Sequence, residues 1–281
     1  MKFSFLIFIF SLISFDSTAQ IDDKGLGSIW FKILPEKDSL FKKGHSSEKE
    51  LPSKISALIW NIKKAELKSW KKEFVHFGKG KDLFLVQEAY ETDLFISTLN
   101  TFEGFEWNLG ASFLYRKYGD AATGTMVASQ VEPNEVLVKH SPDVEPIAGT
   151  PKSATFVKYA IAGKAEELLV ISVHGINFET NGAFRRHMCQ IKRVIEKHDG
   201  PVLLAGDFNT WNNSRSSHLN SIISRLGLVE APYKNGQARM SFAGHFLDHV
   251  FTRGLIVNTA EVIADSVGSD HKPFLLDFSL P

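Results

Sequence analysis

The stretch LLAGDFNTW, residues 203–211, indicates both a buried strand and a polar site at the end of that strand. Apolar and small residues lead to Gly206, and Asp207 and Asn209 follow two positions apart. A carboxylate and an amide at the end of a buried strand are costly to bury without partners. We therefore expect this strand to deliver Asp207 and Asn209 to a shared site. An ordinary Asx turn after the strand is the alternative.

The same pattern recurs elsewhere in the chain, where apolar segments end in carboxylates, amides or imidazoles. These polar ends are Asn61, Glu88, His174 with Asn177, Asp248, and Asp270 with His271. Their oxygen-rich side chains suit a hard divalent cation such as Mg²⁺. The sequence has no CxxC, HExxH or glycine-rich phosphate loop, so zinc and P-loop chemistry lack support. Taken singly, Asn61 could cap a following helix and His174 could be a core histidine.

Strand-like segments outnumber helical ones. Strands are predicted at 54–61, 82–89, 124–130, 134–141, 154–162, 167–178, 201–209, 246–254, 255–264 and 272–280, and helices at 63–78, 183–199 and 216–227. Since helices do not alternate regularly with the strands, the pattern favours two sheets packed face to face with helices outside over an all-parallel sheet.

Length and charge set limits on domains and partners. The 281 residues carry 32 basic and 32 acidic side chains. Without a net positive field, tight non-specific DNA binding is not expected, which leaves a small phosphate ester or a locally bound nucleic acid. From residue 54 to 281 no linker or repeat interrupts the chain, so one domain is expected there. Residues 20–53 are polar and irregular, and we predict an N-terminal extension that either lies on the domain or is poorly structured.

The first residues, MKFSFLIFIFSLISFDSTAQ, have one lysine, an apolar run and small residues before the cleavage point. This is typical of a signal peptide, expected at 1–19, and of a periplasmic or secreted protein. The apolar run is short for a membrane span, which needs about 20 residues, so no transmembrane domain is expected after cleavage. An uncleaved N-terminal anchor is the alternative. The only cysteine, Cys189, rules out an internal disulfide.

The ordered series WNI, QE, H–N, GDFN, LDH and SDH, from about Ile55 to Ser279, resembles the endonuclease/exonuclease/phosphatase superfamily. This superfamily includes pancreatic-type deoxyribonucleases, abasic-site endonucleases and neutral sphingomyelinases. The resemblance implies an α+β fold, a four-layer α/β/β/α sandwich of two mainly antiparallel sheets flanked by helices. It also implies a metal-dependent phosphoesterase with a water nucleophile.

The resemblance also implies a role for each site residue. Glu88, Asn61 and Asp270 would belong to the site of a divalent cation, Mg²⁺ or else Mn²⁺ or Ca²⁺. Catalytic roles would fall to Asp207 on the water, to His271 polarised by Asp248, and to His174 as proton donor or phosphate contact. Asn209 and Asn177 would contact phosphate. Trp211, just past the GDFN motif, could stack on a substrate ring or cover the wall of the site.

One departure concerns Lys63 and Lys64, which stand where many nucleic-acid members carry an acidic residue. They put an additional metal ligand in doubt and add positive charge near the entrance. Nucleic-acid phosphodiester, sphingomyelin-like lipid and phosphate monoester all remain open as substrates. A non-catalytic binding module on the same fold is the other alternative, and no stable protein partner is implied.

Overall fold

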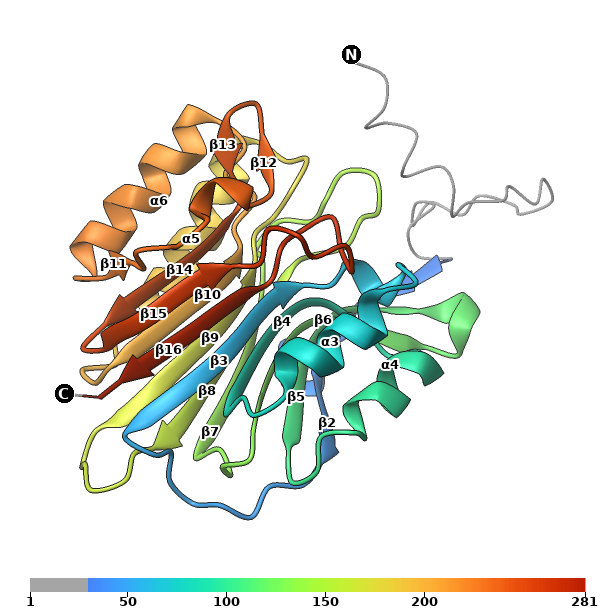
Figure 1. The fold of residues 1–281 in the computed structure, drawn as a ribbon. Helices are drawn as coiled ribbons and strands as arrows, with labels where there is room; N and C mark the ends of the chain where they lie inside the picture. Colours follow the sequence, from blue (N-terminus) through green and yellow to red (C-terminus); the bar gives the residue numbers. More distant parts are fainter. Residues whose placement is uncertain (1–29, 281) are drawn as a thin grey trace.

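Two β-sheets pack face to face in the computed structural model, which describes residues 30–280, and helices cover their outer faces (Figure 1). The first sheet has eight strands in the order β1-β5-β6-β4-β3-β16-β15, with β2 also paired to β5. Their bounds are β1 Phe31–Lys32, β2 Leu40–Gly44, β3 Lys54–Asn61, β4 Leu83–Tyr90, β5 Glu106–Tyr115, β6 Ala121–Ser129, β15 Ile256–Val262 and β16 Phe274–Ser279.

The second sheet has six strands in the order β11-β14-β10-β9-β8-β7. Their bounds are β7 Glu135–His140, β8 Ser153–Ala160, β9 Glu167–His174, β10 Val202–Asp207, β11 Val229–Glu230 and β14 Asp248–Arg253. A separate hairpin joins β12 Ser241–Phe242 to β13 His245–Phe246. Within each sheet one pair is parallel, β3 with β4 and β9 with β10, and a helix connects each of these pairs. Such crossovers bring the carboxyl ends of both strands of a pair to the same edge of the sheet.

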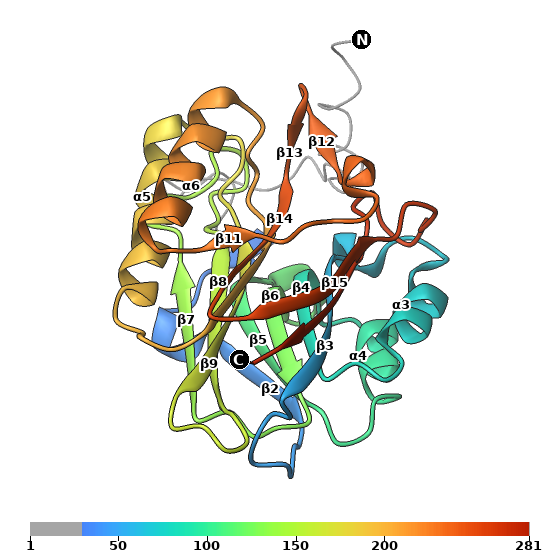
Figure 2. The same ribbon diagram turned by 60° about the vertical axis from the view of Figure 1, so that its left-hand side comes forward.

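Four α-helices form the two outer layers, as the rotated view also shows (Figure 2). They are α3 Trp70–Gly78 and α4 Asp93–Leu99 on the first sheet, and α5 Asn181–Ile195 and α6 Asn213–Arg225 on the second; short 3₁₀ turns lie at η1 Glu36–Asp38, η2 Lys63–Ala65, η3 Arg116–Tyr118 and η4 Gly236–Ala238. The side chains of Thr92, Thr180 and Asn212 cap α4, α5 and α6. The predicted four-layer α/β/β/α sandwich is therefore confirmed.

Three apolar clusters separate these four layers. The cluster between the sheets includes Leu85 and Leu203. The cluster between the first sheet and α3 and α4 is rich in aromatic rings, such as Trp60 and Phe74, and the third cluster packs α5 and α6 on the second sheet. The apolar residues of α5 that recur at helical spacing, Phe184, Met188, Ile191 and Ile195, are buried in this third cluster. The sheets are thus fixed on both faces, which holds the strand ends in place.

The structure differs from the expected elements in its N-terminal half. Of the two alternatives for the N-terminal extension, residues 30–53 lie on the domain and are not poorly structured, because all of β2 pairs with β5 and Leu51 bridges to Ile161. The strand β5 itself was missed, since its buried positions include Asn108, Gly110 and Ser112, which interrupt the apolar pattern. The helix α4 was also missed.

The predicted helix at 63–78 begins only at Trp70, and the tight turn η2 precedes it. The expected signal peptide lies outside the described residues. Among the residues that are described, no helix is long and apolar enough to cross a membrane.

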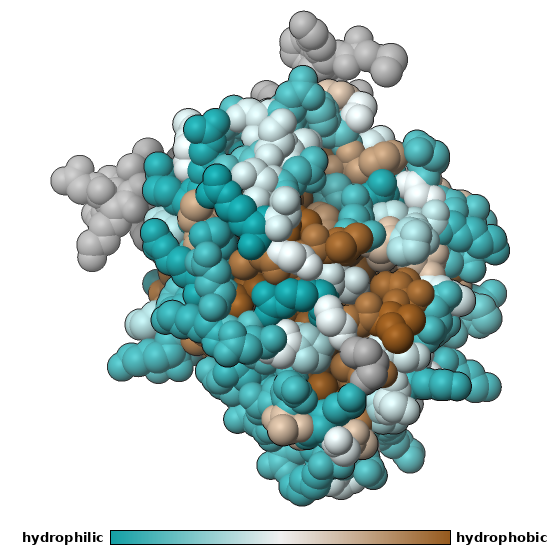
Figure 3. All heavy atoms as spheres, turned by 90° about the vertical axis from the view of Figure 1, so that its left-hand side faces the viewer, coloured by the Kyte–Doolittle hydropathy of each residue, from teal (hydrophilic) through white to brown (hydrophobic). Residues whose placement is uncertain are grey.

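One side of the molecule carries the sheet edges β11 and β15, where apolar side chains gather within a hydrophilic surround (Figure 3). A hollow near these edges is lined in part by Val229, Leu255 and Val257.

Candidate active site

Three polar side chains lie in a row across the second sheet, at the ends of β9, β10 and β14. Asp207 is in register with His174 on the parallel strand β9 and with Asp248 on the antiparallel strand β14. All three residues are at most 5% exposed. The preceding Gly206 has φ +141°, and a Cβ there would lie 2.1 Å from the carbonyl oxygen of Val173. Only glycine allows this close approach of β9 and β10 just before the site.

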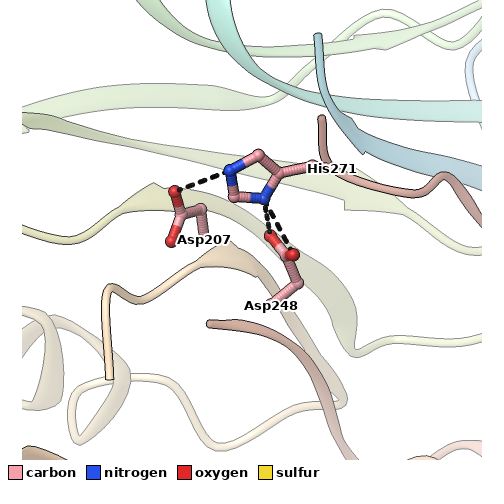
Figure 4. A group of neighbouring side chains, drawn as sticks. All are labelled: Asp207, Asp248 and His271. Carbon is pink, nitrogen blue, oxygen red and sulfur yellow. Dashed lines mark hydrogen bonds and ion pairs between the residues drawn. The ribbon is translucent and has the colours of Figure 1, made fainter. Parts of the chain in front are cut away.

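His271, from the loop before β16, completes the group and joins two carboxylates (Figure 4). Its Nδ1 lies 2.9 and 2.8 Å from the two carboxylate oxygens of Asp248. Its Nε2 faces Oδ2 of Asp207 at 3.8 Å, and Nε2 of His174 lies 3.6 Å from the same oxygen. The indole Nε1 of Trp60 donates to the carbonyl of His271 at 2.9 Å, which anchors the loop. The imidazole is therefore held between two acids.

Asn61 connects this group to the first sheet. Its Nδ2 donates to Oδ2 of Asp207 at 3.1 Å and approaches Oε1 of Glu88 at 3.4 Å. The Oδ1 of Asn61 accepts from the backbone N–H of Lys63. Asn61 therefore stabilises a turn and does not cap α3, which begins only at Trp70. Glu88 lies at a bulge of β4 with φ +53°, a conformation that side chains rarely adopt and that occurs often at functional sites. The two sheets thus contribute to one cluster.

The buried charges perturb one another strongly. Burial alone would lower the pKa of His271, but Asp248 and Asp207 outweigh it and raise this pKa to about 10. Burial raises the pKa of Asp207 to about 7, with Asp248 adding to the effect and His271 opposing it. At neutral pH His271 is therefore protonated, while Asp207 accepts a proton more readily than an ordinary aspartate.

The pKa values of His174 and Glu88 are lowered, whereas those of His271 and Asp207 are raised. Burial lowers the pKa of His174 well below its ordinary value, and Lys152 and His271 lower it further, so His174 is neutral at pH 7. Burial would raise the pKa of Glu88, but Lys64, His174 and Lys152 outweigh it and hold this pKa below the ordinary range. Glu88 is therefore ionised.

The residues fit a hard divalent cation by their chemistry. Ligand atoms of Asp207, Asp248 and His271 lie within 4.8 Å of one another. Since His271 carries a proton at neutral pH, the hard donors are the oxygens of the two aspartates and of the ionised Glu88. The predicted ligands Glu88 and Asp270 are each paired with a lysine in this structure, with Lys64 Nζ on Glu88 at 3.1 Å and Lys63 Nζ on Asp270 at 3.1 Å.

Of the residues predicted to contact substrate, Asn209 lies next to the cluster. Its backbone N–H donates to Oδ1 of Asp207, so the Asx turn forms, while the other carboxylate oxygen faces the two histidines. The amide of Asn209 donates to the carbonyl of Gly175. Asn177 is half-buried on the loop after β9, and its Oδ1 accepts from the N–H of Phe178. The hydrogen bonds of these two side chains thus go to the backbone and not to His271 or Asp248.

Trp211 packs against a residue that sequence reasoning missed, the fully buried Arg215 of α6. The guanidinium lies 4.5 Å from the centre of the Trp211 ring and donates to the carbonyls of Ile176, Asn209 and Glu179. It therefore ties the loop after β9 to the turn after β10. On the sequence Arg215 lies four residues before Leu219 and seven before Ile222, on the buried face of α6, and this spacing is the signal that could have found it.

A buried His–Asp pair facing a second aspartate, at the rim of an α/β/β/α sandwich, defines a protein of the deoxyribonuclease I-like class. Residues 58–271 match the Endonuclease/Exonuclease/phosphatase family, and the chain belongs to this family.

Known proteins agree with this assignment. A protein of Vibrio campbellii named UPF0294 protein is 32% identical over 227 residues, 80% of this chain and 78% of that protein. An endonuclease/exonuclease/phosphatase family protein from Bacteroides thetaiotaomicron has a similar structure, with a TM-score of 0.62 and 15% identity over 83% of this chain and 100% of that chain. D. rerio TDP2, solved with a single-strand DNA product, matches with a TM-score of 0.55 and 14% identity over 81% of this chain and 99% of that chain.

Proposed function

We propose that the protein is a divalent-metal-dependent phosphodiesterase that activates a water molecule for attack on phosphorus. The observation that carries the proposal is the orientation of His271. Its Nδ1 is held by Asp248, while its Nε2 is directed at Asp207 across a gap of 3.8 Å. This separation is longer than a hydrogen bond. A water or a phosphate oxygen placed between these groups would meet a donor and an acceptor together.

Asp207 and His271 would have complementary roles. With a pKa of about 7, Asp207 is suited to accept a proton from the attacking water at neutral pH. His271, with a pKa of about 10, keeps its proton and offers Nε2–H to a phosphate oxygen. Asp248 fixes the orientation of the ring and stabilises its charge.

Glu88, with Asp270, would hold the cation, and Asn61 would orient the carboxylates of Glu88 and Asp207. When bound, a divalent cation neutralises charge on the non-bridging oxygens of the phosphate and lowers the pKa of coordinated water. Mg²⁺ is the proposed ion because the donors are oxygens, and Mn²⁺ or Ca²⁺ would suit the same donor set.

His174, neutral and buried beside Asp207, is better suited to contact a phosphate oxygen than to donate a proton to the leaving group. Asn209 and Asn177 are proposed as further phosphate contacts. Trp211 is already packed on Arg215, which favours its role as a wall of the site.

Nucleic acid is the proposed source of the phosphodiester. Two structures with the same fold support it: D. rerio TDP2 with a single-strand DNA product, and the endonuclease domain of TRAS1, which matches with a TM-score of 0.55 and 19% identity over 81% of this chain and 99% of that chain. The equal numbers of acidic and basic residues suggest local contacts at the site and not a long basic track. A sphingomyelin-like lipid or a phosphate monoester is the alternative substrate.

A binding module without activity is disfavoured, because the chain keeps Glu88, Asp207 and His271 together. We further propose that the protein is exported to the periplasm or secreted, on the basis of the signal-like residues 1–19.

The test is hydrolysis of single-stranded DNA, duplex DNA, sphingomyelin and a phosphate monoester by residues 20–281, with Mg²⁺ and with EDTA. The proposal expects turnover of a DNA substrate that EDTA abolishes and that H271A lowers by about 10²–10⁴-fold. H45N, which changes an exposed histidine, is the control and should be as active as the wild type. Folded protein that cleaves DNA equally well in EDTA, or after H271A, would refute this function.

A further inference from the structure

The turn η2 between β3 and α3 has an unfavourable backbone. Lys63, Lys64 and Ala65 all have positive φ, at 48°, 55° and 59°. Residues with a Cβ seldom adopt this conformation even singly, and none of the three is glycine. The turn is held by Asn61, whose Oδ1 accepts from the N–H of Lys63, and by the carbonyl of Ile62, which accepts from Ala65. Strain of this kind persists where the surroundings enforce it, often at a functional site.

The turn directs two neighbouring lysines at two different carboxylates. Lys63 Nζ lies 3.1 Å from Oδ2 of Asp270, and Lys64 Nζ lies 3.1 Å from Oε2 of Glu88. These are the two acids to which the proposed function assigns the metal. Glu88 itself has φ +53°, so both partners of the second pair have unusual backbone conformations.

A divalent cation on Glu88 would meet the ammonium of Lys64 as a nearby like charge. Two positive charges a few ångströms apart repel each other, and the effect is larger at a partly buried site than in water. The side chain of Lys64 is 25% exposed, so part of it already contacts solvent and can leave Glu88 without crossing the core. Its flexible stem would keep the ammonium within reach of an anion bound there.

We propose that Lys64 is a displaceable counter-ion: it neutralises Glu88 in the metal-free protein, leaves when the cation binds, and then bonds to a phosphate oxygen of the substrate. This inference rests on the proposed function, since it takes Glu88 as a metal ligand. It assigns to Lys64 a phosphate-binding role that links occupancy of the metal site to binding of the substrate. It also explains why a lysine stands where the resemblance led us to expect an acid.

The first test is the affinity for Mn²⁺, measured by calorimetry on the wild type, K64M and K64Q. Removing the competing charge should tighten Mn²⁺ binding by about tenfold in both variants. K68M is the matched control, because Lys68 is exposed four residues further along the chain and the substitution removes the same charge. Its Mn²⁺ affinity should equal that of the wild type. Unchanged or weaker Mn²⁺ binding in both K64M and K64Q would overturn the proposal.

The second test is binding of inorganic phosphate at saturating Mn²⁺. The dissociation constant should rise by about tenfold in K64M, as expected for loss of a charge-assisted hydrogen bond, and should stay unchanged in K68M. Unchanged phosphate affinity in K64M would overturn the transfer of Lys64 to the substrate.

E88Q separates this inference from the proposed function. It should abolish Mn²⁺ binding. If it does so while K64M and K64Q bind Mn²⁺ like the wild type, the metal assignment stands and the role of Lys64 fails. If E88Q binds Mn²⁺ normally, Glu88 is not a ligand and both proposals fail.

Discussion

His187 makes the stability of this protein sensitive to mild acid. The side chain is fully buried on α5, its Nδ1 accepts from the backbone N–H of Ile176, and its Nε2 has no hydrogen-bond partner among residues 30–280. Burial lowers the pKa of His187 to about 3, and the charge of Arg215 adds to the effect. The ring therefore supports the loop after β9, which carries part of the site, only in its neutral form.

The sign of the effect follows from the lowered pKa. An unfolded chain protonates this imidazole below about pH 6.5, whereas the folded protein does not until about pH 3. The stability that His187 contributes is thus complete above pH 6.5 and is lost as the pH falls toward 3. At about 1.36 kcal/mol per pH unit, the loss between pH 7 and pH 5 is about 2 kcal/mol.

The assay is urea denaturation of the wild type and H187N at pH 7 and pH 5. Asparagine can still accept from Ile176 through Oδ1 but does not titrate, so the loss between the two pH values should be smaller in H187N by about 2 kcal/mol. Any cavity left by the smaller side chain lowers stability equally at both pH values, so it cancels in the difference between pH 7 and pH 5. H45N, at an exposed histidine, should keep the wild-type pH dependence. Equal pH dependence in H187N and the wild type would refute the reasoning.

Two further predictions concern the site. In D248N the pKa of His271 should fall by about 1 to 3, because the ring loses the carboxylate 2.8 Å from Nδ1. NMR titration of the metal-free protein measures this pKa, and an unchanged value would show that Asp248 is not what raises it. R215M should lower the free energy of unfolding by about 3 kcal/mol or more, since the buried carbonyls of Ile176 and Asn209 and the part-buried carbonyl of Glu179 lose their donor. The free energy of unfolding of R215K should lie between those of R215M and the wild type. A decrease of less than about 1 kcal/mol in R215M would show that Arg215 does not hold these loops.

The polar strand ends were visible in the sequence because burial makes them unusual. A strand such as Val202–Asp207 is buried throughout, so a carboxylate at its end needs partners, and that requirement can be read without a structure. The alternation of apolar segments likewise predicted two sheets with helices outside. The helix predicted at 183–199, which corresponds to α5, could be read for a similar reason, because helical periodicity is local.

The positions of β2 and β5 in the first sheet could not be predicted from residue type. Asn108 and Gly110 lie in β5 because β2 and β6 pair with this strand on both sides, not because their side chains are apolar. Hydrogen bonding between strands far apart in the chain leaves no local pattern.

The sequence by itself determined which residues are available for chemistry, since Asp207, Asp248 and His271 follow or flank apolar strands in a recognisable order. The tertiary structure alone decided how they are charged. Asp207 and His271 are 64 residues apart in the chain but face each other across 3.8 Å, and their pKa values depend on that burial and proximity. The contacts of Lys64 with Glu88 and of Arg215 with Asn209 were likewise decided only by folding. Electrostatic energies depend on distances in space and on exclusion of water, and neither quantity is encoded in the spacing of residues along the chain.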